Sequence, residues 1–114
     1  MQRGPICKGD VVVTLFPYSD LSDKKKRPAL VVAVFPELSV LILAQITSRE
    51  KSDEFVVELN KSDFESGALR ADSFIRTNFL FTSADELPLY TAGHLKQEKF
   101  EQVIAALLAM LSRD

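Results

Sequence analysis

Residues that build disulfides and metal sites are scarce in this sequence. Its 114 residues include one cysteine, one histidine and no tryptophan. A single cysteine, Cys7, excludes a disulfide within the chain, and a single histidine excludes most metal clusters, so we expect neither a metal nor another cofactor. This use of cysteine is typical of a reducing compartment, and we predict a cytoplasmic protein.

Long apolar runs and an excess of positive charge are also absent. No run approaches the ~20 residues of a membrane-spanning helix, and residues 1–7 lack the apolar segment of a signal peptide. We therefore predict no membrane association. The formal net charge of -2 argues against a uniformly basic nucleic-acid binder, so any nucleic-acid site must be a local patch.

The chain does contain enough apolar residues for one core. Hydrophobic residues make up 46% of the sequence, which is an ordinary share for a globular protein. A chain of 114 residues has the length of one domain. We predict a single domain over residues 1–114.

Short apolar runs separated by turn signals predict five strands. They cover residues 11–16, 29–35, 40–48, 55–59 and 72–81. In the third run, alternation places Ile42, Ala44 and Ile46 on one face. In the fifth run, Ser73, Ile75, Thr77, Phe79 and Phe81 share a face. The same alternation projects Arg76 and Asn78 together to the other side, ~7 Å apart.

The remaining chain predicts short turns and one long helix. Residues 60–67 resemble a helical turn closed by glycine, and residues 83–86 predict a brief helix. Residues 89–95 form a connector, with or without a short strand, in which His94 is a turn residue. A helix begins near Lys96 and fades by Arg113; its apolar stripe comprises Phe100, Val103, Ile104, Leu107, Leu108 and Leu111. These elements predict a mainly β fold, a small and strongly bent antiparallel sheet or barrel with a C-terminal helix.

The densest basic patch lies directly before a predicted core strand. Lys24, Lys25, Lys26 and Arg27 precede Pro28, and a residue before proline is held in extended geometry. Proline is tolerated as the first residue of a strand, so Arg27 is expected at the root of the strand over 29–35. A guanidinium fixed in this way suits phosphate recognition. A solubilising loop remains the alternative.

Two further polar groups interrupt apolar strands. They are Thr47 with Ser48, and Arg76 with Asn78. If the strands curve together, these groups share a cleft with Arg27, where two arginines and a hydroxyl suit a phosphodiester and the charge that develops on it. The alternative is that they are strand-end residues that satisfy caps and turns.

Several segments together resemble the MazF/PemK toxins of bacterial type II toxin–antitoxin systems. The similarity spans nearly the whole chain and rests on Gly9-Asp10-Val11-Val12, Arg27-Pro28-Ala29-Leu30-Val31-Val32, Gln45-Ile46-Thr47-Ser48, Asp63-Phe64-Glu65-Ser66-Gly67-Ala68-Leu69 and Ser73-Phe74-Ile75-Arg76. The resemblance implies an SH3-like barrel with a C-terminal helix, of the kind shared by MazF, PemK and CcdB. It also implies a homodimer.

The same resemblance implies an activity and partners. These toxins are metal-independent endoribonucleases, or mRNA interferases, that cut single-stranded RNA at short sequences. The ribose 2′-hydroxyl attacks the adjacent phosphate, which leaves a 2′,3′-cyclic phosphate and a 5′-hydroxyl. The expected protein partner is a cognate antitoxin, whose acidic and partly disordered segment folds onto the basic cleft. DNA binding is expected only through the antitoxin complex.

The resemblance also implies roles for individual residues. Arg27 matches the catalytic arginine and Thr47 the catalytic threonine, while Arg76 and Asn78 match an arginine and an aspartate that some relatives use as acid and base. We assign Arg27, Thr47 and Arg76 as catalytic. The expected substrate-binding residues are Lys24, Lys25, Lys26, Gln45, Ser48, Asn78 and Asp20.

The sequence departs from the family pattern at the general base. Asn78 stands where the aspartate would be, and an amide cannot accept the proton. A guanidinium is protonated at neutral pH, so Arg27 and Arg76 are assigned to phosphate binding and charge stabilisation, and Thr47 to orienting the phosphate. No residue is identified as the base, and Asp20 is the candidate in the loop.

Two alternative functions use the same fold without RNA cleavage. CcdB-like toxins poison DNA gyrase through the end of the C-terminal helix, where they insert a tryptophan. No tryptophan occurs in the last residues of this chain, which are Met110-Leu111-Ser112-Arg113-Asp114. This absence disfavours the gyrase alternative. The other is a catalytically inactive binding module, for which Asn78 is the only indication.

Overall fold

The computed structural model describes residues 5–16, 25–49 and 53–114. Asp20 and Lys24 therefore lie outside the described residues. Within them, the strands form one sheet of seven, in the order β4-β6-β3-β2-β1-β7-β5, and every neighbouring pair is antiparallel. The strands are β1 (Asp10–Phe16), β2 (Lys25–Phe35), β3 (Val40–Thr47), β4 (Val56–Leu59), β5 (Phe64–Gly67), β6 (Ser73–Ala84) and β7 (Tyr90–Leu95). Two 3-10 turns, η1 (Pro36–Leu38) and η2 (Lys61–Asp63), precede β3 and β5, and α1 (Gln97–Leu111) closes the chain.

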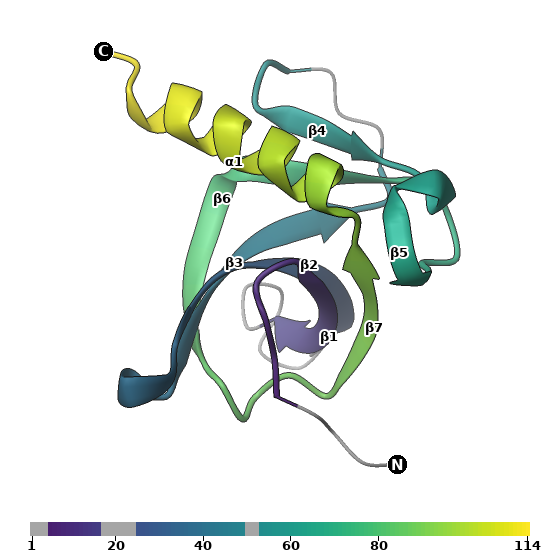
Figure 1. Ribbon diagram of the computed structural model, residues 1–114, viewed down its shortest axis with the longest axis vertical. Helices are drawn as coiled ribbons and strands as arrows, with labels where there is room; N and C mark the ends of the chain where they lie inside the picture. Colours follow the sequence, from purple (N-terminus) through teal and green to yellow (C-terminus); the bar gives the residue numbers. More distant parts are fainter. Residues whose placement is uncertain (1–4, 17–24, 50–52) are drawn as a thin grey trace.

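The sheet curls strongly, and α1 lies across β4 and β6 (Figure 1). The predicted fold, a strongly bent antiparallel sheet with a C-terminal helix, is confirmed. None of the helices in the described part of the chain has the length and apolar character needed to cross a membrane.

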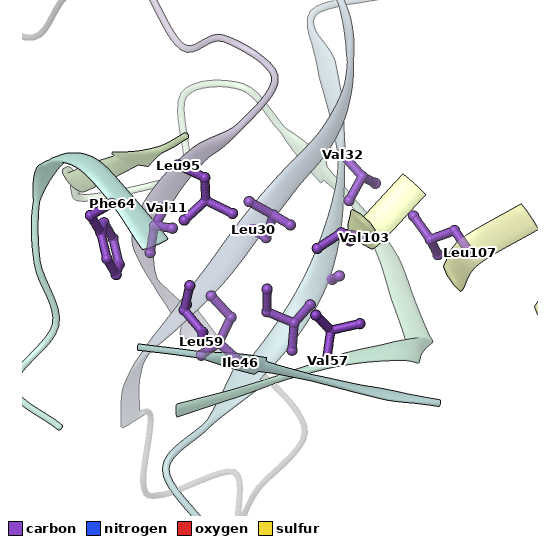
Figure 2. Close-up of a cluster of buried hydrophobic side chains, with 12 residues drawn as sticks. Val11, Leu30, Val32, Ile46, Val57, Leu59, Phe64, Leu95, Val103 and Leu107 are labelled. Atoms are coloured by element: carbon purple, nitrogen blue, oxygen red, sulfur yellow. The ribbon is translucent and has the colours of Figure 1, made fainter. Parts of the chain in front are cut away.

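Alternation along the strands fills two separate apolar clusters. Ala44 and Ile46 of β3 join the larger one, which packs against Val103 and Leu107 of α1 (Figure 2). Leu41 and Leu43 point to the other side of β3 and join the smaller one, which contains Val12, Phe16, Ala29 and Val31. The predicted division of β3 into two faces is therefore confirmed.

The predicted faces of the fifth strand are wrong over its second half. Gln45 of β3 pairs with Arg76 of β6, but its neighbour Ala44 pairs with Leu80. Three residues of β6 therefore lie between the partners of two successive residues of β3. A register shift by an odd number exchanges the two faces of a strand. Consequently Ile75 lies in the larger cluster and Phe81 packs against the smaller one, although simple alternation placed both on one face.

Other local predictions also change. The segment over 60–67 is the η2 turn followed by strand β5, which pairs with β7. Residues 89–95 contain a six-residue strand, and β6 continues to Ala84 where a brief helix was expected. The stripe of α1 is also narrower than expected, because Leu108 and Leu111 are exposed while Met110 packs on the core.

Strand β2 begins earlier than its proline suggested. Lys25 and Lys26 pair with Phe16 and Leu15 of β1, so part of the basic run is strand, not loop. Pro28 pairs with Val13 of β1, whereas the described pairing with β3 begins only at Ala29. Pro28 has no backbone N–H to donate, and this is tolerated because β2 is paired only with β1 at this position.

Candidate functional site

A cleft opens where β2 and β3 stop pairing. The last described pair between the two strands is Ala29 with Gln45, whereas β2 stays paired with β1 as far as Lys25. Beyond that pair, residues 26–28 stay paired with β1, and Ile46 and Thr47 stay paired with β6. The two strand ends therefore separate, and each presents its polar residues to the space between them.

This cleft has a volume of about 560 Å³, within the range of small-ligand sites. Its described lining residues are Val13, Lys26, Arg27, Pro28, Ile46, Thr47, Ser48, Leu69, Arg70, Ala71, Ser73 and Tyr90. The floor is apolar, and three of the lining side chains are cationic, while none of the described ones is a carboxylate or an imidazole. An anionic ligand suits such a lining even though the whole chain carries a net negative charge.

Arg27 and Thr47 reach the cleft from opposite sides. Arg27 is half-buried and is held by pairing with Thr14 of β1. The hydroxyl of Thr47 accepts a 3.1 Å hydrogen bond from the backbone N–H of Arg49, which fixes its oxygen at the end of β3. Because a hydroxyl also carries a donor, Thr47 can still donate to a phosphate oxygen.

Arg76 lies one residue pair behind the cleft. It pairs with Gln45 in β3 and with Val56 in β4. Its guanidinium donates a 3.0 Å hydrogen bond to Oε1 of Gln45 and lies 5.2 Å from the centre of the Phe79 ring. Its Nε is buried and has no hydrogen-bond partner in the described part of the chain.

The remaining sequence candidates divide between the cleft and its surroundings. Lys26 and Ser48 line the cleft with Arg27 and Thr47, whereas Gln45 and Arg76 are not among its lining residues. Lys25 is exposed on β2. Asn78 falls in the three-residue segment of β6 that has no partner on β3, and its side chain is exposed.

Sequence reasoning missed the wall formed by Tyr90 and the 68–72 loop. Tyr90 begins β7 opposite Val13, and the loop supplies Arg70. Gly67 turns the chain into this loop with a φ of +72°, and a Cβ there would lie 2.1 Å from the carbonyl oxygen of Ala92. Glycine is therefore required. The glycine within Glu65-Ser66-Gly67-Ala68 was the available signal for a tight turn.

The sole histidine belongs to a different part of the sheet. His94 lies in β7, not in a turn, and its Nδ1 is 2.7 Å from Oδ1 of Asp10. The other carboxylate oxygen of Asp10 accepts a 2.8 Å hydrogen bond from the N–H of Cys7. These contacts tie the start of β1 to β7.

The sequence profile of the family described as "PemK-like, MazF-like toxin of type II toxin-antitoxin system" matches residues 7–111. The chain belongs to this family. The profile match covers both strands that open the cleft. No curated protein sequence matches the chain.

Solved structures share the fold of this MazF-like chain. "Endoribonuclease in complex with its cognate antitoxin from Mycobacterial species" superposes with a TM-score of 0.73 at 14% identity, covering 94% of this chain and 95% of that one. "Mycobacterium tuberculosis toxin MazF-mt6" gives 0.72 at 17% identity, with coverages of 92% and 98%. MazE-MazF (Form-II) from Deinococcus radiodurans gives 0.73 at 16% identity, with coverages of 97% and 99%. At such identities the likeness establishes a common fold.

Proposed function

We propose that this MazF-like toxin is a metal-independent endoribonuclease that cuts single-stranded RNA. The observation that carries the proposal is the cleft at the splayed strand ends. It brings together Arg27 and Thr47 from two separate sequence segments, over an apolar floor and without a described carboxylate. The resemblance to structures called endoribonucleases supports the same activity.

The proposed reaction is an internal transfer at phosphorus. The 2′-oxygen of the ribose forms a bond to the adjacent phosphorus, and the bond from phosphorus to the 5′-oxygen breaks. The proton of the 2′-hydroxyl is lost and one is gained by the 5′-oxygen, which yields a 2′,3′-cyclic phosphate and a 5′-hydroxyl. Negative charge grows on the non-bridging oxygens during this step, and we assign Arg27 to stabilise it.

Thr47 and Arg76 have supporting roles in this scheme. The Thr47 hydroxyl, fixed by the Arg49 N–H, donates to a non-bridging oxygen and orients the phosphate. Arg76 lies behind the cleft and binds the RNA backbone next to the cut, with its guanidinium oriented by Gln45. Lys25, Lys26 and Ser48 add backbone contacts, and Lys24 and Asn78 remain proposed contacts.

No general base is assigned within the cleft. Its described lining residues include neither a carboxylate nor an imidazole, so these residues contribute to catalysis by orienting the phosphate and stabilising its charge. Asp20, which lies outside the described residues, remains the proposed candidate.

The proposal includes partners and a compartment. We expect a homodimer, an antitoxin whose acidic segment competes with RNA for the basic cleft, and action on RNA in the cytoplasm. Exposed apolar residues support self-association: Phe35 and Leu38 lie by the turn after β2, and Leu87 lies by the turn after β6. These turns are joined by a 2.9 Å hydrogen bond from the Asp85 N–H to the Ser39 carbonyl. Such a patch favours a self-complementary contact.

The test is cleavage of a mixed RNA by pure protein in EDTA, with both new ends mapped. We expect cutting at a short sequence, with a 2′,3′-cyclic phosphate and a 5′-hydroxyl at every cut. An otherwise identical RNA with one 2′-deoxynucleotide before the mapped cut should resist, because it lacks the attacking hydroxyl. Loss of cutting in EDTA, or 5′-phosphate ends, would contradict the proposal. A folded protein that cuts no RNA would leave one of the two binding functions, gyrase poisoning or an inactive module.

A further inference from the structure

We propose that Tyr90 forms a stacking subsite for the nucleobase next to the phosphate held by Arg27 and Thr47. The position of this base relative to the cut rests on the proposed function. The binding site itself rests on the shape and chemistry of the cleft. Its ligand class is a single-stranded nucleotide.

The position of Tyr90 is fixed by the sheet. Tyr90 pairs with Val13 in β1, and Val13 pairs with Pro28 in β2, so three adjacent strands place these residues in one row. The N–H of Leu89 also donates a 2.8 Å hydrogen bond to the Val13 carbonyl. With strands about 4.8 Å apart, the backbone of Tyr90 lies roughly 10 Å from that of Pro28. Arg27 follows in the next row, paired with Thr14, and it lines the same cleft as Tyr90, so both residues border one short span of ligand.

Tyr90 is an exposed aromatic beside an apolar floor. It is 48% exposed, whereas Val13 and Ile46, which line the same cleft, are buried. Its hydroxyl makes no hydrogen bond to any described part of the chain, and tyrosine is enriched at interfaces, where its apolar ring and its polar hydroxyl can both be used. An open ring of this kind is a platform for bases, because every nucleobase has a π-face and stacks without a particular edge.

Arg70 supplies charge to the same wall. It lies in the 68–72 loop, which is held at one end by a 3.3 Å hydrogen bond from the Ala68 N–H to the Ala92 carbonyl. At the other end, the Ser73 hydroxyl donates a 3.0 Å hydrogen bond to the Ala71 carbonyl. The Arg70 guanidinium has no ion-pair partner among the described residues. It is therefore available for the phosphate of the stacked nucleotide.

The chain offers a direct optical test, because it lacks tryptophan and contains two tyrosines. In a Tyr18→Phe protein, Tyr90 is the only tyrosine and reports on its own surroundings. The probes are the four homo-dinucleotides of 2′-O-methyl RNA, which cannot be cleaved because the attacking hydroxyl is blocked. At least one of them should quench the Tyr90 fluorescence in a saturable manner.

The variants separate stacking from folding. Removing one stacked aromatic should weaken dinucleotide binding in Tyr90→Ala by about 5- to 150-fold, measured by anisotropy of a labelled probe. Tyr90→Phe should bind within about twofold of the parent, because the ring stacks without the hydroxyl. Leu108→Ala, which removes another exposed apolar side chain on α1 outside the cleft lining, is the matched control and should bind normally. Arg70→Ala should lower the salt slope of binding by about 0.7.

The outcomes distinguish this subsite from the proposed function. Quenching that depends on Tyr90, in a protein that cuts no RNA, would retain the subsite and overturn the endoribonuclease. Cutting with the same rate and the same sequence preference in Tyr90→Ala, together with unchanged dinucleotide binding, would overturn the subsite and retain the enzyme. Absence of any quenching would also overturn the subsite. If Tyr90→Ala weakened the binding of an antitoxin peptide but left dinucleotide binding unchanged, the subsite would be overturned. The cleft wall would then be a contact for protein.

Discussion

The side chain of Arg76 in β6 is joined to that of Gln45 in β3 by a 3.0 Å hydrogen bond from Nη1 to Oε1. A neutral acceptor orients the guanidinium but leaves its positive charge available for another group. The same guanidinium lies against the Phe79 ring, which restricts its motion further. Gln45, which we assigned to substrate binding from sequence, is thus better placed to position Arg76.

This relationship predicts the effect of a single charge at Gln45. In Gln45→Glu, the new carboxylate forms an ion pair with Arg76 and cancels its charge toward RNA. The slope of log affinity against log salt should then fall by about 0.7 for single-stranded RNA, and affinity should fall with it. Filter binding of an uncleavable RNA over a salt series measures both. An unchanged slope in Gln45→Glu would show that Arg76 does not contact the RNA. Gln45→Met is the uncharged control and should preserve the slope.

Arg27 should matter most for the rate. Arg27→Ala should lower cleavage by about 10²–10³-fold, the usual effect of losing one charge-stabilising contact. Arg27→Lys should recover part of the rate, because lysine supplies charge without the two-pronged geometry. The matched control is Arg113→Ala, which removes an exposed arginine that is paired with Glu54 and lies outside the cleft lining. Full activity in Arg27→Ala would refute its assignment.

Asn78 should not respond strongly to a restored carboxylate. Its side chain is exposed within the irregular segment of β6, so Asn78→Asp is not expected to place a base at the cleft. The cleavage rate should change less than about tenfold, and its pH profile should gain no acidic limb. A large gain with such a limb would show that this chain lacks a base that its relatives use.

Self-association should be detectable at micromolar concentration. Sedimentation equilibrium should give twice the 12.7 kDa mass of the chain. Leu38→Glu places a charge in the apolar patch beside η1, where Leu38 is exposed, and should shift the equilibrium toward the monomer. A wild-type protein that sediments as a clean monomer would refute the dimer.

Stability should depend on the buried face of α1. Leu107 is 6% exposed and Leu108 is 60% exposed, so the two neighbours form a matched pair on one helix. Leu107→Ala should lower the free energy of unfolding by about 2–5 kcal/mol, whereas Leu108→Ala should change it by less than about 0.5 kcal/mol. Urea denaturation measures both, and equal effects would contradict the observed packing of α1.

The sequence was most informative where periodicity was regular. Alternation over residues 40–47 correctly divided β3 between two faces, and the spacing of Phe100, Val103 and Leu107 identified α1. The register shift in β6 could not be predicted, because it arises from the pairing of Ala44 and Gln45 with residues more distant in the sequence. No local pattern specifies that pairing. Strands β5 and β7 were also difficult, since each is short and pairs mainly with residues far away in the chain.

The candidate site was only partly predictable for a similar reason. Arg27 and Thr47 each carried a local signal, the proline that follows one and the strand end that holds the other. Their meeting depends on where β2 and β3 stop pairing, which no local pattern specifies. Tyr90 carried no signal, because an aromatic at the start of a short strand is equally suited to packing.

The odd register shift in β6 links the two halves of the protein during folding. One strand delivers Ile75 to the cluster under α1 and Phe81 to the cluster on the other side of the sheet. Neither cluster can be assembled without fixing the register that also fills the other. The two clusters should therefore melt together, in a single cooperative transition that fluorescence and circular dichroism report at the same temperature.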